Sequence, residues 1–285
     1  MRHSIRRTGL TLAPAAIITT MTNKITIMDD ESEDVKDERL GRSISASVRG
    51  EANPEEAEVR SADAAARLLI WLSPAFPVGS FAFSHGLEWA VHAGHVHDVA
   101  TVISWLDALL EHGAPRNDAI FAIYAWRATT SRDAHGLREV NALALATAGS
   151  RERHLETTAQ GNAFVAIIRQ AWREPTFDWG VDALQGDVAY PVAVGLTCAA
   201  HGVSSRDMLR SYVLAQVQNL VSAIIRLSVI GHTDGQRAIA ALLPGVGRLA
   251  LSTEAATLDD IGGAAFQSDI ASLRHETQYS RLFRS

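Results

Sequence analysis

The sequence predicts an all-α fold, in which residues 61–285 form a single multi-helix, bundle-like domain with a loop shaped by proline and glycine near its start and a tail at its end. Two observations predict it. From about Ala62 onward, apolar residues recur every three or four positions, and no long stretch alternates apolar and polar residues as a strand would. Glycine, proline, asparagine and aspartate interrupt this pattern at intervals of roughly one helix length. With 47% hydrophobic residues, the chain can bury a substantial core.

Residues 1–60 differ in composition from the rest of the chain, and we expect them to be a disordered extension. They combine a basic start, a mildly apolar stretch at Leu10–Met21 and the acidic run Asp29–Asp34. The apolar stretch is a poor signal peptide, because a proline and several threonines interrupt it. The alternative is a later start codon, at Met21 or Met28.

The first break in the helical pattern is the segment Ser73–Ser80, with the sequence Ser-Pro-Ala-Phe-Pro-Val-Gly-Ser. Two prolines and a glycine cannot continue a helix there. Three phenylalanines, Phe76, Phe81 and Phe83, lie in this segment or just after it. We therefore expect an ordered loop of defined shape rather than a linker.

Two later segments have the clearest helical patterns. Between Asp98 and Gly113, apolar residues recur at three- and four-residue steps, and the two end residues are of types that cap a helix. A long central helix is predicted from Ser204 to Gly231, because Ser204 and Asp207 resemble a capping box. Its apolar stripe consists of Leu209, Val213, Val217, Leu220, Ile224 and Leu227.

The remaining helices are predicted between turn residues, over 118–130, 136–148, 151–172, 188–201, 234–242 and 254–273. One of them begins after Ser150 with the charged run Arg151, Glu152 and Arg153. We interpret this run as a solvated face with local ion pairs. The functional alternative is a patch that faces a partner.

The residue inventory excludes several classes of function. The formal net charge is −6, so the chain has no overall basic field for a nucleic acid. Cys198 is the only cysteine, which excludes an internal disulfide or a cysteine-rich zinc site and fits a reducing cytoplasm. No lysine follows Lys36, and the sequence contains neither a phosphate-binding loop nor a dinucleotide fingerprint. We expect a protein that is not an enzyme, needs no cofactor and binds neither nucleic acid nor membrane.

A histidine cluster, His92, His95 and His97, is the one group of residues that suggests a metal. Imidazole is a good ligand for nickel or zinc, and helical spacing places the first two on neighbouring surface positions. The alternative is a solvated helix end beside Gly94, because histidines without a nearby carboxylate or thiol seldom define a specific site.

The last residues of the chain, Tyr279–Ser285, mix tyrosine, leucine and phenylalanine with two arginines. These residue types are enriched where proteins meet, and a terminus often becomes ordered when it docks on a partner. The alternative is a tail that packs on its own core. The two interpretations are compatible.

Several separated segments, in the same order and from about Leu68 to the end of the chain, resemble the UreF family of urease accessory proteins. The matching segments are Leu72–Phe81, Ser84–Trp89, Arg153–Gly161, Pro191 with Gly195, Asn219–Leu227 with Gly231, and the closing motif Tyr279–Ser285.

The resemblance implies an all-α protein that forms a homodimer, binds the accessory protein UreD, also called UreH, and through that complex recruits the GTPase UreG. The assembly would insert nickel into apo-urease. The residues expected to contact partners lie in the loop, the long helix and the tail: Pro77, Gly79, Phe81, Ser84, His85, Glu88, Arg226, Tyr279, Arg281, Leu282, Phe283, Arg284 and Ser285. Among these, Arg281 is expected to make charge-assisted hydrogen bonds to loop carbonyls or to a partner carboxylate, and Leu282 and Phe283 are expected to be apolar anchors.

Two other functions remain open at this point. In the first, His92, His95 and His97 bind nickel directly, as in a metallochaperone. In the second, the chain alters the turnover of the GTPase UreG through an arginine near the nucleotide, and the candidates are Arg226, Arg281 and Arg284.

Overall fold

The structure is a computed structural model that describes residues 54–284. Most of the extension expected at residues 1–60 lies outside the described residues, as does Ser285. Residues 54–60 belong to the first helix, α1 (Pro54–Trp71). Throughout the described residues the regular structure consists of eleven α-helices and two short 3₁₀-helices without a strand, which confirms the predicted all-α fold.

The segment after α1 is a loop that folds back before α2 (Leu87–His92). Gly79 adopts φ 77° and leads into the 3₁₀-helix Ser80–Ala82, and Gly86 adopts φ 76° just before α2. These left-handed conformations favour glycine, which has no side chain to clash with the backbone. A Cβ at Gly86 would also lie 2.5 Å from the backbone nitrogen of Ser272, so the C-terminal part of the chain packs directly on this loop.

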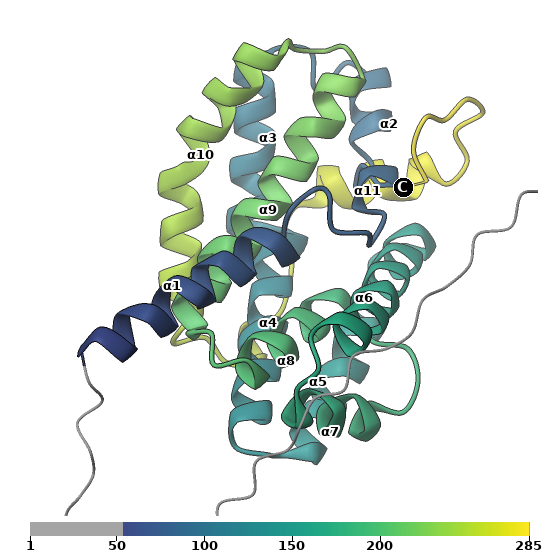
Figure 1. Ribbon diagram of the computed structural model, residues 1–285. Coiled ribbons are helices and arrows are strands. Elements are labelled where there is room, and N and C mark those ends of the chain that lie inside the picture. The colour runs from purple at the N-terminus through teal and green to yellow at the C-terminus, as the bar shows by residue number, and fades with distance from the viewer. Residues whose placement is uncertain (1–53, 285) are drawn as a thin grey trace, which may run out of the picture. The chain divides into compact units, whose positions relative to one another are not determined.

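Three long helices lie side by side in the upper half of Figure 1: α3 (Val99–His112), α9 (Ser205–Arg226) and α10 (His232–Thr253). The predicted capping of α3 is confirmed, because the Asp98 carboxylate accepts a hydrogen bond from the Thr101 amide at 2.8 Å and Gly113 follows the last turn. The predicted start of α9 is confirmed as well, since the Ser204 hydroxyl accepts a hydrogen bond from the Asp207 amide at 3.1 Å.

The second group of helices surrounds α8 (Tyr190–Ala200), whose residues from Pro191 to Cys198 are all buried. Around it pack α4 (Ala114–Thr130), α6 (Arg151–Ala171) and α7 (Pro175–Leu184), while α5 (Ala134–Ala146) packs on α4 and α7. None of the described helices combines the length with the apolar character that crossing a membrane requires.

Several predicted helices differ from the observed ones. α9 ends at Arg226 rather than at Gly231, because Ser228 turns the chain with φ 59°.

α7 was not predicted, although its sequence has two start signals. Pro175 occupies the first position of the helix, and the Glu174 carboxylate accepts a hydrogen bond from the Phe177 amide at 3.0 Å.

The helix predicted at 234–242 was too short, because α10 continues through Pro244 to Thr253. An interior proline costs about 3 kcal/mol of helix stability. Burial of an apolar stripe on both sides of the proline offsets this cost, since a fully buried aliphatic side chain contributes about 1.5–3 kcal/mol. The buried residues of this stripe are Leu242, Val246, Leu249 and Ala250.

The helix predicted at 254–273 was wrong over its first half. A 3₁₀-helix, Leu258–Asp260, forms there because the Asp260 carboxylate accepts a hydrogen bond from the Thr257 amide at 2.7 Å. The chain then runs without helix until α11 (Phe266–His275). Backbone hydrogen bonding fixes this stretch, since the Ala264 amide donates to the His112 carbonyl at 2.9 Å.

Gly161 on α6 offers a test of the packing against α8. A Cβ at this position would overlap the carbonyl oxygen of Val188, which is backbone and cannot move aside. Gly161→Ala should therefore destabilise the protein by about 2–3 kcal/mol, measured by chemical denaturation.

The matched control is Gly247→Ala on α10, where nothing lies within 4 Å of an added Cβ. There the substitution should stabilise the helix by about 0.5–1 kcal/mol. Equal stability of the two variants would contradict the close helix packing described above.

Candidate functional site

The candidate site is built where the end of the chain returns to the loop after α1. We call residues 276–284, which follow α11, the tail; Figure 1 shows it in yellow beside α11. The Arg284 amide donates a hydrogen bond to the Ala82 carbonyl at 2.7 Å. The tail therefore packs on its own protein, as one of the two interpretations of the sequence expected.

Glu88, on the first turn of α2, binds the backbone of the tail. One carboxylate oxygen, Oε1, accepts a hydrogen bond from the Leu282 amide at 2.6 Å, and the other, Oε2, accepts one from the Phe283 amide at 2.9 Å. Hydrogen bonds to an ionised carboxylate are about twice as strong as those between neutral groups. Glu88 is itself buried, so water does not compete for these bonds.

The same carboxylate faces His275, the last residue of α11, whose side chain has no exposed surface. The ring nitrogen Nε2 lies 3.1 Å from Oε2 of Glu88, and Nδ1 lies 2.7 Å from Oε2 of Glu152 on α6. Arg281 of the tail completes the group, since its Nη1 donates to Oε1 of Glu152 at 2.7 Å. We call Glu88, Glu152, His275 and Arg281 the tail clamp.

Phe283 is the apolar anchor of the tail, and it points inward. Only 4% of its surface is exposed. The guanidinium carbon of Arg226, at the end of α9, lies 4.4 Å from the centre of its ring, which is the geometry of a cation–π contact. Arg226 also donates a hydrogen bond to the Phe81 carbonyl, so it joins the tail to the loop.

Other side chains of the loop and tail point to solvent. Leu282 keeps 64% of its surface exposed, and Phe81 and Tyr279 are exposed as well. We call Phe81, Tyr279 and Leu282 the outer residues. Large apolar side chains that remain exposed while their neighbours are fixed are typical of protein interfaces.

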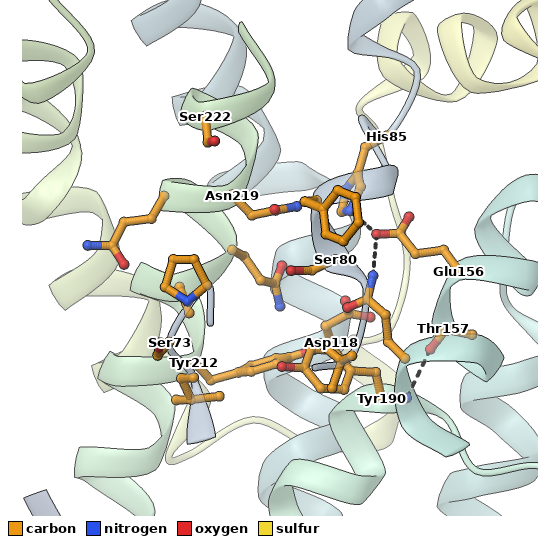
Figure 2. Close-up of a pocket in the computed structure, with 18 of the residues that line it drawn as sticks. Ser73, Ser80, His85, Asp118, Glu156, Thr157, Tyr190, Tyr212, Asn219 and Ser222 are labelled. Atoms are coloured by element: carbon orange, nitrogen blue, oxygen red, sulfur yellow. Dashed lines mark hydrogen bonds and ion pairs between the residues drawn. The ribbon is translucent and has the colours of Figure 1, made fainter. Parts of the chain in front are cut away.

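A cavity of about 110 Å³, lined by both apolar and polar side chains, lies beside the loop, between α6 and α9 (Figure 2). His85 and Glu156 meet at its edge, with Nε2 of His85 lying 2.8 Å from Oε1 of Glu156. Gln160 donates to the same oxygen at 2.9 Å, and Arg153 pairs with the other carboxylate oxygen. On the side of α9, Tyr212 and Gln216 line the cavity, and the Tyr212 hydroxyl is buried.

The carboxyl groups of the cavity differ in their pKa. Burial opposes ionisation of Glu156, but the positive charge of Arg153 and the contact with His85 outweigh it and hold its pKa at about 2. Burial raises the pKa of Asp118 to about 6, and Arg153 only partly compensates from 3.9 Å. Burial also lowers the pKa of His85, assisted by the charge of Arg153.

The sequence-predicted partner residues fall into three groups. Those on the surface are Pro77, Phe81, Arg226, Tyr279, Arg281, Leu282 and Arg284, with Gly79 partly exposed. Those that are buried are Ser84, His85, Glu88 and Phe283. Ser285 lies outside the described residues. The buried group shapes the loop and the tail from inside.

The sequence interpretation missed the structural role of Glu152 and His275. Arg151, Glu152 and Arg153 were interpreted as a solvated face with local ion pairs. Arg151 is exposed, but the interpretation was wrong for Glu152, which is buried in the tail clamp, and Arg153 is half-buried and reaches the cavity. The one local signal was the polar row Glu152, Glu156 and Gln160, spaced four residues apart on one face of α6. His275 had no signal apart from standing just before the tail.

The histidines proposed as nickel ligands lie on the surface at the end of α2. His92, His95 and His97 are all exposed. Nδ1 of His97 lies 3.2 Å from the Gly94 carbonyl, and the His95 ring lies 5.7 Å from that of Trp89. In the part of the chain that the structure describes, no three His, Cys, Asp or Glu residues are placed to hold a metal ion.

Comparisons with known proteins place the sequence among the members of one family. The UreF family model matches residues 96–243. A protein from Rhodopseudomonas palustris strain BisB5 is 53% identical over 219 residues, which cover 77% of this chain and 90% of that protein. One from Xanthobacter autotrophicus is 52% identical and covers 76% and 90%, and one from Methylorubrum populi is 50% identical and covers 78% and 99%. Each is named urease accessory protein UreF.

Phe283 and Leu282 are adjacent residues with opposite orientations, so they test how the tail is held. Phe283→Ala should release the tail and increase the rate of trypsin cleavage after Arg281 by on the order of tenfold or more, because the buried anchor is lost. Leu282→Ala should leave the cleavage rate unchanged. Equal rates in the two variants would contradict the inward anchoring of Phe283.

Asp118 predicts a pH dependence of stability. Because its pKa is raised from 3.8 to about 6, the folded chain binds this proton more tightly than the unfolded chain, and stability falls as the pH rises through that window. Asp118→Asn removes the loss, so at about pH 7 the variant should be more stable by about 2 kcal/mol, and at about pH 4 nearly equal to the parent. Urea denaturation at both pH values measures this, and a pH-independent difference would refute it.

Proposed function

This chain belongs to the UreF family of urease accessory proteins, and from that membership we propose that it is a non-enzymatic adaptor in urease maturation. In this role it assembles with UreD, also called UreH, and with the GTPase UreG, and the complex inserts nickel into apo-urease. The relatives' name supports the connection to urease. The partners and the nickel step rest on the resemblance of the loop, α9 and tail sequences to the family.

The observation that carries the adaptor role is the two-sided tail. Its inner side is fixed to the protein by Glu88, Glu152 and the pocket of Phe283. Its outer side presents Leu282 and Tyr279 to solvent. A segment that is already ordered loses little conformational entropy on binding, which favours recognition by a partner.

Arginines beside the tail give the proposed surface its polar part. Arg281 and Arg284 are both exposed, although Arg281 uses one nitrogen to bind Glu152. Arg281 has further N–H groups with which to meet a partner carboxylate, and arginine is enriched at interface hot spots. Apolar and basic groups side by side therefore favour a partner with an apolar surface and nearby carboxylates.

A non-enzymatic role is supported by how the polar groups of the cavity are used. His85, Arg153 and Gln160 are all directed at the carboxylate of Glu156. A general base has to be available to a substrate proton, whereas these groups hold the loop against α6. Homodimer formation and a cytoplasmic location belong to the same proposal and rest on the resemblance to the family.

The experiment compares alanine substitutions of exposed tail side chains with the substitution of an equally exposed leucine on another helix. Leu282→Ala and Tyr279→Ala should weaken binding to UreD/UreH by on the order of tenfold, because each removes an apolar contact at the proposed interface. Leu251 on α10 is 63% exposed against 64% for Leu282, so Leu251→Ala is the matched control and should bind like the parent. Calorimetry with purified UreD/UreH gives the affinities.

Two outcomes would contradict the proposal. If both tail variants bind UreD/UreH with the parental affinity, the tail is not the contact surface. If the parent chain itself does not bind, the adaptor role is wrong for this protein. Circular dichroism of each variant should show unchanged helicity, since the substituted side chains are exposed.

A further inference from the structure

The number of protons in the tail clamp follows from its geometry. Both ring nitrogens of His275 face carboxylate oxygens, at 2.7 Å from Glu152 and 3.1 Å from Glu88. A carboxylate is only an acceptor, so each of these contacts needs an N–H on the ring. A neutral imidazole carries one N–H, and only the doubly protonated imidazolium satisfies both carboxylates at once.

The charge balance agrees with this protonation state. Among the described residues, α2 contributes Glu88 and α6 contributes Glu152, while the tail contributes Arg281. With His275 protonated, two positive and two negative charges meet. Glu88, Glu152 and His275 are buried, and buried charges are stable only when they are paired, whereas Arg281 reaches Glu152 from the surface. Ser150 and Ser272 are neutral and hydrogen-bond to each other, and the Glu276 carboxylate accepts a hydrogen bond from the Arg151 amide.

We propose that His275 is a pH-dependent latch that holds the tail while its ring is protonated and releases the tail when the ring loses that proton to solvent. Loss of the proton would leave a ring lone pair facing a carboxylate oxygen at hydrogen-bond distance. It would also leave one uncompensated negative charge in a buried site. The imidazolium state therefore stabilises the closed tail at lower pH, and this stabilisation is lost as the pH rises.

When the His275 ring loses its proton, the tail moves rather than the helices, because the tail is held more weakly than the helices. α2 and α11 pack against each other, and Leu87 and Ala271 in their interface are fully buried. The tail is held by two amides on Glu88, the Arg281 ion pair, the Arg284 amide, the Glu276 contact with the Arg151 amide, the Arg284 guanidinium over Phe83 and the single buried anchor Phe283. A chain end with so few contacts opens locally at lower free energy than a packed helix.

The inference does not depend on the adaptor role, since it concerns only the protein alone. If both hold, alkaline conditions would undo the ordered conformation of Leu282 and Tyr279. Binding to a partner through the tail would then weaken with rising pH.

Hydrogen exchange of the purified chain tests the latch. The amides of Leu282 and Phe283 report the clamp directly, because both donate to Glu88. Their protection factors, corrected for the intrinsic pH dependence of exchange, should fall by on the order of tenfold between about pH 6 and about pH 9. The ring nitrogen shifts of ¹⁵N-labelled His275 should change over the same pH range.

Glu152→Gln is the informative variant. The glutamine amide donates an N–H to unprotonated Nδ1, and its oxygen still accepts from Arg281, so the neutral ring is satisfied as well. In this variant the two tail amides should remain protected at about pH 9. His135→Gln is the matched control, because His135 is an exposed histidine beside Glu139, and it should show the parental loss of protection.

Each outcome has one meaning. A loss of protection at high pH in the parent and in His135→Gln, but not in Glu152→Gln, supports the latch. Protection that is flat with pH in the parent overturns it, because the tail would then stay closed whether or not the His275 ring carries its second proton. An equal loss in Glu152→Gln also overturns it, because the release would then not depend on the His275 contact with Glu152.

Discussion

The buried contact between His275 and two glutamates is the interaction on which the rest of the site depends. It joins residues that are 187 and 123 positions apart in the chain, and through them it brings α2, α6 and α11 to one point. Because Glu88 also binds two backbone amides of the tail, the same group fixes the last residues of the chain. Phe283 then becomes buried while Leu282 stays exposed, so the composition of the proposed partner surface is set from inside the protein.

Much of the fold was predictable because helix signals are local. The helix at 98–113 was predictable from Asp98, Gly113 and an apolar stripe, which all lie within a few turns of one another. The errors arose where tertiary packing decided the outcome. Pro244 stands inside a helix because apolar residues on both sides of it are buried, and the sequence around a proline does not reveal what packs against it.

Less of the site was predictable, because its contacts join distant parts of the chain. Glu88 and Arg281 were singled out by their motifs, but Glu152 resembled an ordinary surface charge at the start of a helix. Its burial depends on the returning tail, which places Arg281 and His275 against it. The orientation of the tail had the same origin: Leu282 and Phe283 are both apolar, and the inward side of Phe283 follows from its contact with Arg226 on a distant helix.

The most direct test of the central claim is assembly with partners in the absence of the tail. The full chain and a chain that ends at Gln278 would each be mixed with UreD/UreH and UreG and separated by size-exclusion chromatography with light scattering. The account predicts a ternary complex for the full chain only, with helicity preserved in the shortened chain because its helices end at His275. A ternary complex of equal mass and stability with the shortened chain would contradict the claim that the tail forms the partner surface.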